Sequence, residues 1–152
     1  GIAAYKEAVL KVNELYPLTD EGKEAKRILE QEIPNLEQLT LNEEESNNWK
    51  MIYDLSIETE ASIKDLTAKI NKYIADTHNN KLKLSTDLYD NNKQLLVIHG
   101  FLSKETALAV NALLQDVKGY KVKQKGLPIS IHNYKVIQIH KNLEQYIIAS
   151  NK

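Results

Sequence analysis

The sequence predicts an α+β protein in which a helical hairpin precedes a larger module of strands and helices. Apolar residues first recur every three to four positions, and the spacing changes to strict alternation at Trp49. The chain has 152 residues, of which 42% are hydrophobic, and this length suffices for one compact domain with a short addition.

The first part is expected to be two helices joined by a short turn, over residues 1–34. The apolar positions of the first helix are Ile2, Tyr5, Val9, Val12 and Tyr16. Pro17 ends it, because the residue before a proline is disfavoured in helical conformation. Thr19 or Asp20 can cap the second helix, and Pro34 is expected to end it. The apolar face of that helix is Ala25, Ile28, Leu29 and Ile33.

Residues 35–48 are predicted to form a linker to the second module. Leu, Glu, Asn and Ser dominate this stretch without a clear period. Glu43, Glu44 and Glu45 stand together without basic neighbours, which favours a solvated loop over a metal site or a site for a basic partner.

The second module, residues 49–152, is expected to begin with a strand and a long helix. Trp49, Met51, Tyr53 and Leu55 alternate with Lys50, Ile52 and Asp54, as in a half-buried strand. A helix then starts at 58–61 and ends at 78–80. Its predicted buried stripe is Ile63, Leu66, Ile70, Tyr73, Ile74 and Thr77.

Two further strands, residues 82–89 and 94–99, are separated by Asp90, Asn91 and Asn92, residue types that favour a hairpin turn. Residues 95–98 are continuously apolar, which predicts a central strand covered on both faces. Ser103 is expected to cap a helix that Gly119 ends. The apolar stripe of this helix is Ala107, Leu108, Val110, Leu113, Leu114 and Val117.

The last part is predicted to contain a short strand at 129–131, a turn at His132 and Asn133, a strand at 134–140 and a helix at 142–150. Pro128 indicates an edge position for the first of these strands. The segments 50–73, 94–117 and 134–149 then share one plan of strand, polar bend and helix. This order predicts a ferredoxin-like β-α-β-β-α-β module with an extra strand and helix, and with its two long helices on one face.

No constellation in the sequence supports catalysis, a cofactor or a metal ion. Lys and Arg number 20 against 21 Asp and Glu, so the net charge of -1 disfavours nucleic-acid binding. The chain has no cysteine, few glycines for phosphate-binding loops, and no apolar run long enough for a transmembrane helix. Glu58 and Glu60 lie in a polar bend, where general acid chemistry is unsupported.

The four histidines lack the spacing of metal ligands. They are His78, His99, His132 and His140. His99 and His140 are expected at the ends of strands, where bonding to a nearby carbonyl is favoured over metal binding. The eight tyrosines are mostly expected at core edges, and Trp49 is the best candidate for an exposed aromatic side chain at a partner surface. No individual partner-binding residue is assigned.

Residues of the first part resemble the closing helices of a tetratricopeptide repeat array, in which a Tyr-x-x-Ala pattern packs the helix pair and a Tyr-Pro step ends it. The residues that carry this resemblance are Tyr5, Ala8, Leu15, Tyr16, Pro17, Glu24, Ala25, Ile28 and Leu29. Stretches 94–101 and 133–143 look like the C-terminal region of the tetratricopeptide lipoproteins of Bacteroidetes gliding motility and type IX secretion, the SprE and PorW group.

This resemblance implies a non-enzymatic envelope protein that helps secretion components to assemble or to be regulated. It would face the periplasm and be anchored to the outer membrane through an N-terminal lipoprotein segment that is missing here. The start at Gly1, inside a helical pattern, likewise suggests a fragment of a longer array.

Two other classes of function remain as alternatives. A domain similar to the sporulation-related repeat would bind peptidoglycan in a groove on the open sheet face, lined by residues such as Trp49, Tyr53 or Tyr134. A small hydrolase or metal enzyme would require His99 and His140 to meet at one ion.

Overall fold

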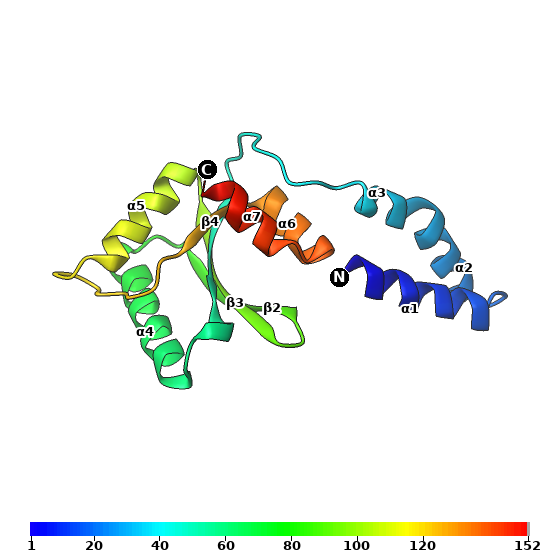
Figure 1. The fold of residues 1–152 in the computed structure, drawn as a ribbon, viewed down its shortest axis with the longest axis horizontal. Helices are drawn as coiled ribbons and strands as arrows, with labels where there is room; N and C mark the ends of the chain where they lie inside the picture. The colour runs from blue at the N-terminus through cyan, green and yellow to red at the C-terminus, as the bar shows by residue number, and fades with distance from the viewer. Residues whose placement is uncertain (152) are drawn as a thin grey trace. The chain divides into compact units, whose positions relative to one another are not determined.

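The computed structural model describes residues 1–151 and shows a mixed α+β fold with a four-stranded antiparallel sheet (Figure 1). The chain divides into two compact units. One unit combines residues 1–42 with the segment from Lys135 onward, and the other is Glu43–Tyr134. This division differs from the predicted 49–152 module, because the C-terminal segment groups with the N-terminal helices.

The first predicted helix and the start of the second are confirmed. Helix α1 spans Ile2–Leu15 and helix α2 spans Asp20–Arg27. The Thr19 hydroxyl accepts a hydrogen bond from the Gly22 N–H at 3.0 Å and so caps α2. Gly22 is required by a close approach, because a Cβ there would lie 1.7 Å from the Tyr16 carbonyl oxygen.

The prediction that Pro34 ends the second helix is wrong. The chain continues from α2 through a π-helix, η1, at Ile28–Glu32 into α3 at Ile33–Glu37. Pro34 stands in the first turn of α3, where a missing N–H breaks no helical hydrogen bond. The irregular stretch therefore begins after Glu37 and not at residue 35.

The sheet has the order β2-β3-β1-β4, which the sequence could not fix, and each neighbouring pair is antiparallel. Its strands are β1, Trp49–Asp54; β2, Lys83–Asp90; β3, Lys93–Phe101; and β4, Leu127–Ser130. Strand β3 is central and its residues 95–98 are buried, as predicted. Pro128 lies in the edge strand β4, also as predicted.

Helices α4, Glu60–Thr77, and α5, Lys104–Gln115, connect the strands. Thr59 and Ser62 form a reciprocal capping box at the start of α4, and a short 3-10 turn, η2 at Leu55–Ile57, precedes it. The predicted Ser103 cap of α5 is confirmed. The predicted end at Gly119 is wrong, because α5 ends at Gln115 and a turn follows around Asp116. Three residues of its predicted stripe are exposed: Leu108, Leu113 and Val117.

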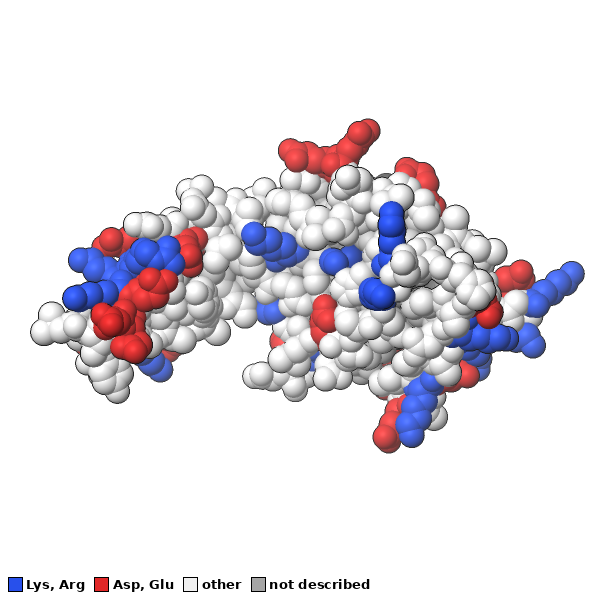
Figure 2. Space-filling view, turned by 180° about the vertical axis from the view of Figure 1, so that it is seen from behind, with Lys and Arg blue, Asp and Glu red and all other residues white. Residues whose placement is uncertain are grey.

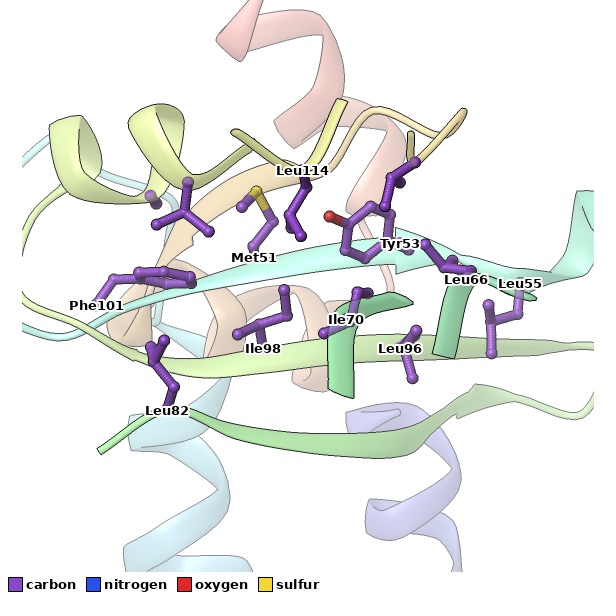
Figure 3. Packing of buried hydrophobic residues seen from close by; sticks show 13 residues of the cluster. Met51, Tyr53, Leu55, Leu66, Ile70, Leu82, Leu96, Ile98, Phe101 and Leu114 are labelled. Atoms are coloured by element: carbon purple, nitrogen blue, oxygen red, sulfur yellow. The ribbon is translucent and has the colours of Figure 1, made fainter. Parts of the chain in front are cut away.

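The main core lies between one face of the sheet and both long helices, as the crossover rule predicts (Figure 3). Met51 and Tyr53 of β1 and Leu96 and Ile98 of β3 project from the sheet into this core. Leu66 and Ile70 of α4 and Leu114 of α5 fill it from the helical side, and all seven side chains are at most 3% exposed.

The prediction of a strand at 134–140 is wrong, since this segment is a helix. Helix α6 spans Ile131–His140 and α7 spans Leu143–Ser150, the latter as predicted. Asn133, Val136 and Ile137 are buried, and this spacing is helical. The β-branched residues of this segment favour strands in general, but packing and burial decide which conformation a given segment adopts. The third repeat of strand, bend and helix therefore does not exist.

Candidate functional site

The second face of the sheet carries a connected set of polar side chains within the Glu43–Tyr134 unit. Lys50 alternates with the core residue Met51 and therefore lies on this face. Lys50 is directly opposite His99 of β3 in the antiparallel register. Ser85 and Asp87 of β2 lie beside His99, and Tyr134 reaches them from α6. These five residues are called the sheet-face network below.

Every link of the sheet-face network is a hydrogen bond or a ring contact. The Lys50 Nζ atom lies 2.8 Å from His99 Nδ1, and the Ser85 Oγ atom lies 2.6 Å from His99 Nε2. Ser85 Oγ donates to Asp87 Oδ1 at 2.8 Å, and the Tyr134 hydroxyl donates to Asp87 Oδ2. The Lys50 ammonium also stands 5.6 Å from the centre of the Tyr134 ring.

The hydrogen-bond directions in this network determine the state of His99. An ammonium group only donates, so His99 Nδ1 must accept the bond from Lys50. His99 Nε2 then carries the ring proton and donates to Ser85, whose own proton goes to Asp87. In this arrangement the imidazole cannot remove a proton from Ser85, so the Ser85 and His99 pair is not a nucleophile with its base.

The surroundings of His99 also favour the neutral ring. Burial lowers the pKa of His99, the nearby Lys50 ammonium lowers it further, and the Asp87 carboxylate opposes them. Burial likewise lowers the pKa of the Lys50 ammonium, and Asp87 again opposes the shift. The network thus balances one ammonium against one carboxylate through a neutral imidazole and a hydroxyl.

The other three histidines lie at the ends of helices. His78 takes the left-handed conformation at the end of α4, with a φ of 54°. The Nε2 atom of His140 lies 3.0 Å from the Leu36 carbonyl oxygen, which confirms carbonyl bonding for this residue. His132 lies in the first turn of α6. Within residues 1–151, no group of three or more metal-ligating side chains is found.

The predicted aromatic and acidic candidates are mostly engaged within the fold. Trp49 is only half-buried, but its indole N–H donates to the Ser46 carbonyl oxygen at 2.9 Å and its ring packs against the main core. Tyr53 is 3% exposed, so it does not line an open groove, contrary to the prediction. Glu58 accepts hydrogen bonds from Ser62 and Gln124.

Exposed apolar side chains gather instead at the turn of the helical hairpin. Leu15 is 68% exposed, Tyr16 56% and Leu18 88%. These three residues are called the hairpin patch below. Leu15 and Tyr16 are among the residues on which the expected resemblance to tetratricopeptide repeats rests, whereas Leu18 carries no signal apart from its place between the two helices.

Charged side chains around the hairpin are of both signs, as Figure 2 shows for the N-terminal helices. Arg27, for example, forms ion pairs with Glu24 at 2.6 Å and with Glu32 at 2.8 Å. No helix within residues 1–151 is long and apolar enough to cross a membrane. Comparisons with family models, with curated proteins and with solved structures gave no match.

Proposed function

We propose that this chain is a non-catalytic protein-interaction module, and that the hairpin patch binds an apolar helical surface of a partner. The observation that carries this proposal is the exposure of Leu15, Tyr16 and Leu18, which stand together at one end of the hairpin. Exposed large apolar residues in a contiguous group are typical of protein interaction sites.

A helical partner is favoured by the shape of α1. Ala4 and Ala8 are exposed one turn apart beside Tyr5, and small residues allow a second helix to approach closely. The buried hydrophobic residues of the hairpin core are Val9, Ala25 and Ile33, a small cluster. A single helical repeat of this kind gains most of its buried surface from a stacked neighbour.

The resemblance to the tetratricopeptide lipoproteins supplies the biological setting of the proposal. The partner would be a cell-envelope component of gliding motility and type IX protein secretion. The module would face the periplasm and be held at the outer membrane by a lipoprotein segment outside this chain.

The second module is proposed to be a ferredoxin-like domain that carries the hairpin. The connection β1-α4-β2-β3-α5-β4 and the sheet order β2-β3-β1-β4 support this assignment, because each helix links two parallel strands across a third. The two helices after β4 replace the strand and helix expected from the sequence.

Binding to envelope components tests the proposal. The immobilised chain is incubated with envelope extract, and retained proteins are identified by mass spectrometry and compared with those retained by a Leu15→Ser, Leu18→Ser variant. Ile57→Ser is the matched control, because Ile57 is 81% exposed in the other unit. Secretion or motility components should be retained by the wild type and the control and lost from the double variant.

Purified peptidoglycan sacculi are tested in parallel. Binding to sacculi without retention of any secretion component would overturn the proposal in favour of a glycan-binding domain. Retention that is unchanged by the double substitution would show that the hairpin patch is not the binding surface.

A further inference from the structure

The sheet-face network depends on the protonation state of His99. Its Nδ1 atom is 2.8 Å from the Lys50 ammonium, a distance that requires Nδ1 to accept a hydrogen bond. A second proton on the imidazole would occupy Nδ1 and place two cations in contact. Protonation of His99 and the bond from Lys50 therefore exclude each other.

The groups that face His99 come from each element of the network. They are the Lys50 ammonium of β1, the Lys83 ammonium and Asp87 carboxylate of β2, and the Tyr134 hydroxyl of α6. Lys83 is opposite His99 in the register but its side chain is exposed, whereas Lys50 is half-buried. The Asp87 carboxylate already accepts hydrogen bonds from the Ser85 and Tyr134 hydroxyls, so it has less capacity to stabilise an imidazolium.

The same network anchors the start of α6 to the sheet. Tyr134 is held through its hydroxyl by Asp87 of β2 and through its ring by Lys50 of β1. Tyr134 is also the last residue of the Glu43–Tyr134 unit, which is called the sheet unit below. Displacement of Lys50 from His99 would therefore also remove the contact between the Lys50 ammonium and the Tyr134 ring.

We propose that the sheet-face network is a pH-sensitive latch, in which protonation of His99 displaces Lys50 and loosens the first turn of α6 from the sheet. The latch is a property of the sheet unit and does not depend on the hairpin patch. A fall in pH would thus increase the mobility of the part of α6 that follows Tyr134.

The direction of the pH effect follows from the sign of the shift at His99. Its pKa in the folded chain is lowered, chiefly by burial, from the ordinary value of about 6.5. The unfolded or loosened state therefore binds the proton more tightly. The latch is fully closed above about pH 6.5, and its stability is lost as the pH falls from there through the folded-state pKa.

An NMR titration of the intact chain measures the protonation of His99 directly. The His99 ring signal is assigned from its loss in a His99→Gln spectrum, and its midpoint is expected below about 6.5. Lys50→Met should raise that midpoint, since it removes the adjacent cation. His78→Gln is the control, because His78 lies at the end of α4 and should leave the His99 midpoint unchanged.

Hydrogen exchange tests whether the protonation opens the latch. The Ile131 N–H, which donates to the Asn48 carbonyl, and the Asn133 N–H, which donates to Ser130 Oγ, report on the first turn of α6. After correction for the intrinsic rate, their exchange should accelerate by up to about tenfold for each unit by which the His99 pKa is lowered. This acceleration between pH 7 and pH 5 should disappear in His99→Gln.

Three results would overturn the proposal. They are a wild-type His99 midpoint at or above about 6.5, a midpoint that Lys50→Met leaves unchanged, and an acid-induced acceleration that persists in His99→Gln. If a substitution prevents folding, the His99 signal is assigned through the backbone resonances of the wild-type chain, and the wild-type midpoint still tests the proposal.

Discussion

The helical hairpin and the sheet core differ most in how much apolar surface each one buries. Thirteen buried residues form the core between the sheet and helices α4 and α5, and they come from β1, η2, α4, β3, α5 and the loops that contain Leu82 and Val122. The hairpin core has three buried residues. Burial of apolar surface is the main source of folding free energy, so we expect the sheet core to be more stable than the hairpin. This expected difference is compatible with the proposal that the exposed apolar residues of the hairpin bind a partner.

The largest expected effect is in the sheet core. Phe101→Ala removes a side chain that is 2% exposed and should lower the free energy of unfolding of the sheet unit by about 4 kcal/mol. Urea denaturation followed by circular dichroism measures this loss. Leu88→Ala is the control, because Leu88 is 66% exposed on the same sheet and should change the free energy by less than about 0.5 kcal/mol. A loss below 1 kcal/mol for Phe101→Ala would contradict the assigned core.

The hairpin should respond to Gly22→Ala without an effect on the sheet. The added Cβ would lie 1.7 Å from the Tyr16 carbonyl oxygen, so the turn between α1 and α2 must move away from α2. We expect a local destabilisation of about 2 to 3 kcal/mol, seen as faster amide exchange in α1 and α2 alone. Gly119→Ala is the control, because its Cβ would meet no atom nearer than 3.7 Å. Equal acceleration of β3 amides would show that the two regions unfold together.

Two substitutions at helix caps, one in each region, should each lower stability by about 1 kcal/mol. Thr19→Ala removes the acceptor for the Gly22 N–H in the hairpin, and Thr59→Ala removes the acceptor for the Ser62 N–H at the start of α4. The first should accelerate exchange in α2 only, and the second should lower the urea midpoint of the sheet unit. Serine at either position keeps the hydroxyl and should restore the wild-type behaviour. An unchanged urea midpoint for Thr59→Ala would refute the role assigned to that cap.

The smallest expected effect concerns an exposed ion pair. Lys6 Nζ lies 2.9 Å from Glu37 Oε1 and joins α1 to α3, but both side chains are more than 40% exposed. Lys6→Met should therefore destabilise the hairpin by less than about 1 kcal/mol, and 1 M salt should have a similar small effect in the wild type. Amide exchange of α1 at two salt concentrations measures it. An effect as large as that of Gly22→Ala would mean that ion pairs, and not packing, hold the hairpin.

Elements whose signals are local were predictable from the sequence. The alternation from Trp49 to Asp54 and the Ser103 cap identified β1 and the start of α5, because both depend on neighbouring residues only. The segment 131–140 was mispredicted because Val136, Ile137 and Ile139 suit a strand as well as a helix, and burial by the rest of the fold decides between them. Pro34 was misread because a proline is equally compatible with the end of one helix and the first turn of the next.

The sheet-face network could not be predicted because it depends on strand order. The turn at Asp90 and Asn92 places β2 beside β3, and so brings Ser85 near His99. The approach of Lys50 requires β1 to be the other neighbour of β3, and the alternation of side chains alone does not determine this order.

The most direct test of the proposed contrast between the two regions is native-state hydrogen exchange on the intact chain. We predict that amides of α1 and α2 exchange through local openings at least about 2 kcal/mol below the opening free energy of β3 amides. A partner that binds the hairpin patch should raise the protection of α1 and α2 selectively. Equal protection of the hairpin and of β3 in the free chain would contradict the account, because the hairpin would then be as stable as the sheet core without any partner.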